Sequence, residues 1–359
     1  MSIKLKGLTW NHARGWGPMD AVGDAYRQSG KDVLVDWDIQ PLEGFESRPL
    51  DELTDIYDLL IIDHPHVGIA AESSLLLPVG ELEDAYTSCC RESYDWNSEN
   101  WAVPIDAACH VSAVKGCDSI AGKTWQEIID MSASQPMGIP LKGVHSLMAL
   151  LTLLATNDTP LDPQNGFPED MTKPLDVLLS LSKAAHSDSL DWNPIVCLDA
   201  LSKGDIQMIP LTFGYSSIDD KELIFGELPS YDGTIKAGGI LGGTGIAVSA
   251  TTKHPEEALD FAHFCGSGFV QTNHWAEYGG QPAHRQAWDE LSKSEPFYRN
   301  TYSTQEGVYL RPRFNGWCGL QTEMGQVLED WLRDGSQTIS LIDNQLRELW
   351  QNSQLALQP

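Results

Sequence analysis

Residues 59–68 read LLIIDHPHVG, an apolar run that ends abruptly in an acid, two histidines and a proline. An unbroken apolar run of this length is typical of a strand that is buried on both faces, as in a parallel sheet. In open α/β sheets the ligand crevice lies beyond the carboxyl ends of the strands. The sequence therefore places Asp63, His64 and His66 where such a fold binds its ligand.

The residues before this run predict alternating strands and helices. Residues 3–10 (IKLKGLTW) and 32–39 (DVLVDWDI) have the pattern of strands, and residues 17–30 have apolar side chains at helical spacing and end on a glycine. Residues 50–56 predict a short helix before the strand at 57–63. This order indicates a doubly wound α/β domain, with the loop after the first strand at the same edge as Asp63.

The rest of the chain continues the alternation. Further strands are predicted at 99–116, 137–141 and 205–215, and another within the glycine-rich stretch 238–267, which then continues as a helix from Pro255. Helices are predicted at 124–133, 145–157, 322–332 and 338–351, the first with a capping box formed by Thr124 and Glu127.

Length and composition indicate a folded protein with two domains. The chain has 359 residues, which exceeds the usual size of one hydrophobic core. Hydrophobic residues make up 42% of the chain, enough for packed cores, so disorder is excluded.

The charge excludes some partners. The chain has 23 Lys and Arg against 51 Asp and Glu, a formal net charge of -28. Such a field repels phosphate backbones and anionic membrane surfaces, so we expect no nucleic-acid or membrane partner and a solvated acidic surface.

The cysteines and the first residues indicate a reducing compartment. The seven cysteines have no spacing typical of a zinc site or a disulfide framework. The start MSIKLKGLTW lacks the apolar core of a secretory signal, and no stretch of about 18 apolar residues occurs. As written, the chain is expected in the cytoplasm, or in the periplasm if a leader was removed.

At this point a resemblance is visible in five motifs that occur in order: YDLLIIDHPHVGIAAESSLLLPV, WAVPIDAACHVSAVK, TWQEII, ALSKGDIQMIPLTFGY and GGTGIAVSATTKHPEEALDFAHF. Together they resemble the extracellular solute-binding proteins of ABC importers, the family related to sugar-binding proteins, although no leader is seen. The resemblance implies a type II periplasmic-binding-protein-like fold of class α/β, with two lobes, doubly wound sheets and an interlobe cleft that closes on its ligand. We expect residues 1–106 and 246–310 in one lobe, residues 107–245 and 311–359 in the other, and crossovers near 106, 245 and 310.

The resemblance also implies contact residues for a small-molecule ligand, an ABC permease as a further partner, a monomer, and no cofactor or metal. By position, the ligand contacts are Trp10, Asn11, His12, Arg14, Asp63, His64, His66, Asp106, His145, Ser146, Phe213, Tyr215, Gly242, Gly243 and Thr244, with Trp275 and Trp317 as further stacking platforms.

Several roles are open for the residues 63–66, DHPH. Because Pro65 favours an extended His64, the two histidines are expected to project to the same side, and Asp63 to orient one imidazole by accepting its ring proton. Hydrogen bonding to a ligand is the first interpretation. Acid/base chemistry, a metal site completed by other histidines, and a structural turn are the alternatives.

Other candidates have two interpretations each. Trp10 either stacks on a sugar ring or packs between the lobes. Arg14 forms an ion pair either with a carboxylate or phosphate of the ligand or with the acidic surface of the protein. Asp106 either accepts hydrogen bonds from ligand hydroxyls or fixes the backbone of the hinge. Cys109 is either a nucleophile activated by a neighbouring imidazole or a core thiol. The core thiol is favoured, because neighbours in a strand point to opposite faces and Cys109 and His110 are therefore not expected to pair.

A nucleotide site is excluded at residues 242–245. GGTG lacks the Lys-Ser/Thr ending of a phosphate-binding loop and precedes a strand instead of a helix.

Together these observations predict a solute-binding protein that closes on a small hydroxylated or carboxylated ligand, as in ABC-type import. The alternative is a cytoplasmic isomerase, lyase or hydrolase on the same fold, with acid/base residues among Asp63, His64, His66, Asp106 and His110.

Overall fold

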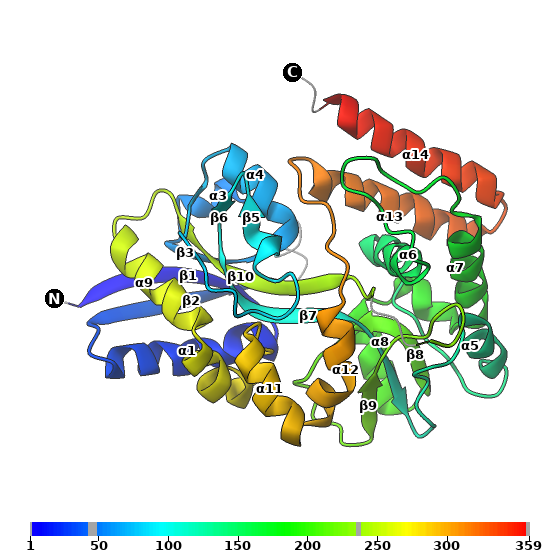
Figure 1. Cartoon of the computed structure of the whole chain (residues 1–359), viewed down its shortest axis with the longest axis horizontal. Helices are drawn as coiled ribbons and strands as arrows, with labels where there is room; N and C mark the ends of the chain where they lie inside the picture. Colours follow the sequence, from blue (N-terminus) through cyan, green and yellow to red (C-terminus); the bar gives the residue numbers. More distant parts are fainter. Residues whose placement is uncertain (1, 42–48, 235–237, 357–359) are drawn as a thin grey trace.

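One mixed sheet runs through the whole molecule (Figure 1). The computed structural model describes residues 2–41, 49–234 and 238–356. The eight strands follow the order β2-β1-β3-β10-β7-β8, with β4 (Leu76–Leu77) beside β10 and β9 (Leu223–Gly226) beside β7. A separate two-stranded sheet pairs β5 (Asp95–Trp96) with β6 (Glu99–Asn100).

The beginning of the chain folds as the sequence predicts. Strands β1 (Ile3–Trp10), β2 (Val33–Gln40) and β3 (Leu59–Asp63) are parallel, and α1 (Ala13–Gln28) connects the first two. The apolar run in β3 is buried on both faces, because Leu59 and Ile61 belong to one hydrophobic cluster while Leu60 and Ile62 belong to another. Short helices α3 (Asp51–Thr54) and α4 (Val67–Glu72) flank this strand in sequence.

Strand β7 (Val103–Lys115) belongs to both halves of the molecule. Its first half pairs antiparallel with β10 (Leu241–Ser249), and its second half pairs with β8 (Met208–Phe213) and β9. Since β10 in turn pairs antiparallel with β3, the sheet of one half continues directly into the sheet of the other.

Helices make up most of the second half. They are α5 (Trp125–Met131), α6 (Val144–Thr156), α7 (Thr172–Ala184), α8 (Pro194–Lys203), α13 (Trp317–Asp334) and α14 (Ile339–Ala356). The apolar helix predicted at 145–157 is confirmed as α6, which is almost wholly buried and packs against α7 and α13. The capping box of Thr124 and Glu127 at the start of α5 is confirmed too.

The strand predicted at 137–141 is wrong. Only Met137 forms a bridge, to Met208, and the chain then leaves the sheet. The backbone N–H of Leu141 donates to the carbonyl of Ser189 instead of to a neighbouring strand, and Pro140 has no N–H to donate. A loop is the result.

Residues after β10 return to the first half and then cross again. They form α9 (Pro255–Gly266), α10 (Gly268–Val270), α11 (Arg285–Ser294) and α12 (Pro296–Glu306). Shorter elements are a π-helix (Gln271–Trp275) and 3₁₀ helices at His64–His66, Glu92–Tyr94, Ser187–Asp191 and Ala276–Tyr278.

The segment 307–316 connects α12 to α13 as an extended chain between the two halves (Figure 1). Helix α12 packs on the second half, since the rings of Phe297 and Phe225 lie 5.1 Å apart. The lobe boundaries near 106, 245 and 310 stay a prediction.

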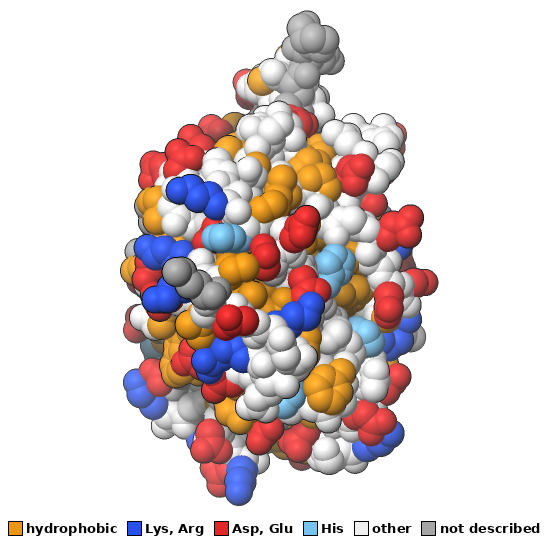
Figure 2. Space-filling model, turned by 90° about the vertical axis from the view of Figure 1, so that its left-hand side faces the viewer, with side chains coloured by type: hydrophobic (Ala, Val, Ile, Leu, Met, Phe, Trp, Pro, Cys, Tyr) orange, Lys and Arg blue, Asp and Glu red, His pale blue; other side chains and the backbone are white. Residues whose placement is uncertain are grey.

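Carboxylates are spread over the surface, as the composition predicts. Figure 2 shows Asp and Glu side chains distributed over the face that it presents, with Lys and Arg between them. In the described part of the chain, no helix combines the length and the apolar character needed to cross a membrane.

Candidate functional site

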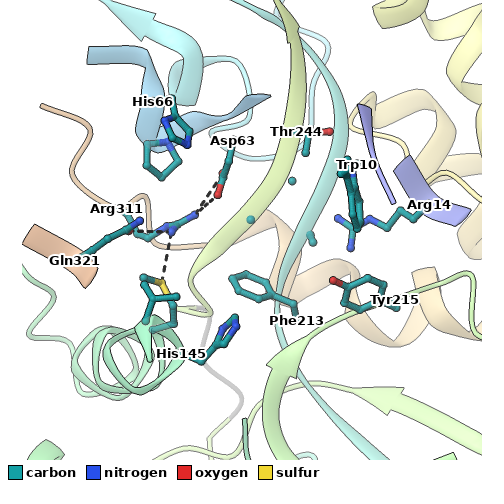
Figure 3. Close-up of a pocket in the computed structure, with 16 residues that line it drawn as sticks. Trp10, Arg14, Asp63, His66, His145, Phe213, Tyr215, Thr244, Arg311 and Gln321 are labelled. Atoms are coloured by element: carbon teal, nitrogen blue, oxygen red, sulfur yellow. Dashed lines mark hydrogen bonds and ion pairs between the residues drawn. The ribbon is translucent and has the colours of Figure 1, made fainter. Parts of the chain in front are cut away.

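A cavity of about 790 Å³, its open mouth included, lies where the two halves meet (Figure 3). Elements from both halves contribute to it. They are the ends of β1, β3 and β8, the middle of β7, the first half of β10, the 3₁₀ helix after β3, the helices α1, α6 and α13, and the segment 307–316. The lining residues are Trp10, Arg14, Asp63, Pro65, His66, Ala108, Val144, His145, Met148, Phe213, Tyr215, Gly242, Gly243, Thr244, Arg311 and Gln321.

Most of the expected contact residues line this cavity. Those that do are Trp10, Arg14, Asp63, His66, His145, Phe213, Tyr215, Gly242, Gly243 and Thr244, and those that do not are Asn11, His12, His64, Asp106 and Ser146. The polar ends of β1 and β3 thus meet at one place, as the strand-end argument predicts.

The turn after β3 separates the two histidines of DHPH. Asp63 is extended, but the chain then forms a 3₁₀ helix with Pro65 in its first turn, so the expected extended His64 is wrong. His64 is 1% exposed, and its Nδ1 lies 3.0 Å from Oδ1 of Asp63, so the expected orientation of an imidazole by Asp63 is confirmed. His66 instead lines the cavity (Figure 3).

Arg311, which no sequence pattern predicts as a site residue, forms part of one wall of the cavity. Its Nη2 lies 3.2 Å and 3.4 Å from the two carboxylate oxygens of Asp63, and its Nη1 lies 3.3 Å from Oε1 of Gln321 and 3.5 Å from Sδ of Met148. One side chain of the segment 307–316 therefore contacts β3, α6 and α13 together.

Arg14 forms a buried ion pair with Asp106. The Arg14 Nε donates to Oδ2 of Asp106 at 2.7 Å, Nη2 donates to Oδ1, and Nη1 donates to the carbonyl of Gly214 at 3.1 Å. Both side chains are buried. Because Arg14 is buried, the interpretation that it pairs with the acidic surface is wrong, while ligand contacts of Arg14 and Asp106 stay predictions.

The two ion pairs flank one residue of β10. Thr244 is in register with Asp63 of β3 on one side and with Asp106 of β7 on the other. One arginine–carboxylate pair thus lies on each side of β10, and the formal charges within each pair cancel.

Glycine is required in this floor. Gly243 has φ +108°, and a Cβ atom there would lie 2.3 Å from the carbonyl oxygen of Asp106. No other residue type fits without moving the backbone, so β7 and β10 approach closely beneath the cavity.

Aromatic rings form the wall opposite Arg311. The rings of Trp10 and His12 stack with centroids 5.3 Å apart, His12 meets Tyr215 edge-on at 5.0 Å, and the Arg14 guanidinium carbon lies 4.9 Å from the Tyr215 ring centre. The His12 side chain also accepts from the N–H of Arg14, so α1 begins at Ala13, earlier than predicted.

His110 and Ser146 have structural partners outside the cavity. Nδ1 of His110 lies 2.8 Å from Oγ1 of Thr152, and its ring packs on Phe213 at 4.4 Å. The Ser146 hydroxyl donates to the carbonyl of Leu141. Asn11 is exposed.

The two tryptophans offered as stacking platforms are buried in cores instead. Trp275 and Trp317 have no more than 1% exposure, so they present no face to a ligand. Cys109 is a core thiol, and burial raises its pKa above the usual range.

The histidines near the cavity are neutral at pH 7. Burial lowers the pKa of His12, His64 and His145 to about 4, and that of His66 and His110 below its usual value. Arg14 acts in the same direction on His12, and Arg311 does so on the other four. They therefore offer hydrogen bonds, not positive charge.

Asp63 is ionised. Burial alone would raise the pKa of its carboxyl, but Arg311 and His64 outweigh burial and hold the pKa below its usual range. Within residues 2–41, 49–234 and 238–356, no three His, Cys, Asp or Glu side chains are grouped as a metal ion requires.

The chain shares its fold with proteins of known structure. No known protein-family profile and no curated protein sequence matches it. Similar structures include MalE proteins and solute-binding proteins of ABC transporters, and they confirm the two-lobed α/β fold class predicted from the sequence.

Three of these structures illustrate the likeness. Maltose-bound MalE3 of Thermotoga maritima has a TM-score of 0.81 at 15% identity, over 97% of this chain and 99% of its own. A solute-binding protein of Thermotoga lettingae with α-D-tagatose has a TM-score of 0.81 at 14% identity, over 97% and 100%. One from Agrobacterium vitis with D-mannitol has a TM-score of 0.74 at 16% identity, over 99% of each chain.

Proposed function

We propose that this protein binds a small hydroxylated ligand in the cavity between its lobes and closes on it. The observation that carries this proposal is the pairing of an ionised acceptor, Asp63, with a cationic donor, Arg311, in one wall of the cavity. Neighbouring hydroxyls of a polyol donate to such a carboxylate and accept from such a guanidinium. The ring of Trp10 supplies an apolar face for a sugar-like carbon skeleton.

The comparisons support a ligand of this kind. The similar structures hold maltose, α-D-tagatose and D-mannitol, and several are described as parts of ABC transporters. We therefore extend the proposal to a monomer that delivers its ligand to an ABC permease. Delivery requires the protein on the outer side of the membrane, and fractionation of the source cells tests this.

An enzyme on the same fold is the second candidate. The observation in its favour is the ionised carboxylate of Asp63 close to the neutral imidazole of His66, since both line the cavity and together could move a proton.

A screen separates the two candidates. Thermal unfolding of the purified protein is followed with sugars, polyols and sugar acids, and each stabilising compound is then observed by NMR over hours. A compound that stabilises the protein and stays unchanged supports the binding protein, whereas conversion supports the enzyme. If no compound of these classes raises the Tm or binds in calorimetry, the proposed function is wrong.

A further inference from the structure

Two guanidinium groups line the cavity, and they differ in how their donors are used. All three nitrogens of Arg14 have partners in Asp106 and Gly214, and the Asp106 contact is two-pronged. Arg311 has weaker contacts of 3.2 to 3.5 Å through Nη1 and Nη2. Its Nε has no partner in the described part of the chain.

The unpartnered Nε is buried. The Arg311 side chain is 5% exposed, so water does not solvate the guanidinium as it would at the surface. A buried charged donor without an acceptor is costly, and native proteins leave few of them. Salt bridges between a guanidinium and a carboxylate are usually near 2.7 to 2.9 Å, so the contact to Asp63 leaves Arg311 under-compensated.

A second buried atom in the same cavity lacks a partner. Nδ1 of His145 has no hydrogen-bond partner among the described residues, although the side chain lines the cavity beside Phe213 (Figure 3). Two buried nitrogens without partners, both on side chains that line one cavity, indicate that a ligand supplies the missing oxygen atoms.

We propose that the ligand is a polyhydroxylated carboxylic acid, whose carboxylate binds the Nε–Nη2 edge of Arg311. The planar fork of a guanidinium fits two carboxylate oxygens, and an ammonium group does not reproduce this geometry. The inference rests on the proposed function and names the chemical class of its ligand.

Asp63 is compatible with a bound carboxylate. Its Oδ1 accepts from Nδ1 of His64 at 3.0 Å, so Asp63 keeps a partner when Arg311 turns to the ligand. Arg311 then lies between two carboxylates, and Asp63 remains available to accept from a ligand hydroxyl.

The test compares ligands that differ only at the carboxylate. Isothermal titration calorimetry with the full chain uses the pairs D-galacturonate and D-galactose, D-mannonate and D-mannitol, and D-xylonate and xylitol. We expect at least one acid to bind about 10- to 100-fold more tightly than its neutral partner, as a charge-assisted contact provides.

Three variants assign the preference to Arg311. In R311Q the acid should bind no more than about twofold better than its neutral partner, and R311K should retain only part of the preference because it keeps the charge but loses the fork. The control R299Q changes an exposed arginine outside the cavity and should preserve the preference. Circular dichroism verifies that each variant is folded, and the wild-type comparison stands even if R311Q does not fold.

Three results overturn the inference. If in every pair that binds the neutral member binds as tightly as its acid, or if folded R311Q keeps the preference, the carboxylate assignment is wrong while the proposed function stands. If no pair binds although the screen finds a neutral ligand, the carboxylate assignment also fails alone; if the screen finds no ligand either, both proposals fail.

Discussion

Nη2 of Arg311 lies 3.2 Å from Oδ2 of Asp63, a contact between residues 248 positions apart in the chain. It connects the end of β3 to the segment 307–316, so both the wall of the cavity and the position of this segment depend on it. A substitution of either residue should therefore lower both the ligand affinity and the free energy of unfolding.

The first prediction concerns Asp63. D63N keeps the shape of the side chain but removes the charge opposite Arg311, so we expect a loss of about 3 kcal/mol in the free energy of unfolding and at least tenfold weaker ligand binding. Urea denaturation and calorimetry measure the two effects. Wild-type stability in D63N would show that the Asp63–Arg311 contact contributes nothing.

His64 and His66 should behave differently although they are two residues apart. His66 lines the cavity, so H66A should weaken ligand binding about tenfold with little change in Tm. His64 is buried and contacts Asp63, so H64A should mainly lower the Tm. Its effect on ligand binding should be indirect, because it removes the contact that orients Asp63. Parallel effects of the two variants on both quantities would contradict the separate positions that the structure gives them.

The buried Arg14–Asp106 pair should be strongly stabilising against single substitutions. D106A leaves the Arg14 guanidinium buried without its counter-ion and should cost about 3 to 5 kcal/mol. The double variant R14M/D106L should lose less than the sum of the single losses, since no charge remains unpaired. The exposed pair of Lys203 and Asp199 is the matched control, and K203A should leave the unfolding curve unchanged.

A glycine pair tests the close approach beneath the cavity. G243A should cost at least about 2 kcal/mol, because it combines a positive φ with a Cβ atom 2.3 Å from a backbone oxygen. G23A, in the interior of α1 with open space around it, should be neutral or stabilising. Equal unfolding midpoints for the two variants would contradict the packing of β10 on β7.

Stability should fall as the pH is lowered from about 6.5 to 4. The pKa of His12, His64 and His145 is about 4 in the folded protein and about 6.5 when unfolded, so over this range the unfolded chain binds more protons. Above pH 6.5 these groups are neutral in both states and contribute no slope. Asp63, whose pKa is depressed, adds a further loss below its unfolded value of 3.8.

Urea denaturation at pH 7.5, 6 and 5 measures this dependence. H145Q removes one titrating group and should make the slope between pH 6.5 and 4 shallower. A flat curve over this range would mean that these imidazoles are not buried as described.

Local patterns predicted the fold and part of the site. The apolar run at 59–62, the capping box at Thr124 and the polar strand ends are short-range signals, and the structure bears them out. They work because burial of a parallel strand and closure of a helix start each depend on a few adjacent residues.

Pairing between distant residues could not be predicted in this way. Arg311 comes from an extended segment without hydrophobic periodicity, so nothing in its surroundings indicated a cavity wall. Arg14 and Asp106 were both expected near the ligand, but the sequence did not reveal that each would satisfy the other. Alternation along β7 likewise does not say which face His110 takes.

Strand β7 has a consequence for how this chain can be divided. Because its first part pairs with β10 and its last part with β8 and β9, a gene fragment that stops near residue 106 encodes only the first four of its 13 residues and leaves it without its later strand partners. The lobes are therefore not separable modules, and recombination between related genes would preserve the protein only when both ends of β7 come from the same parent.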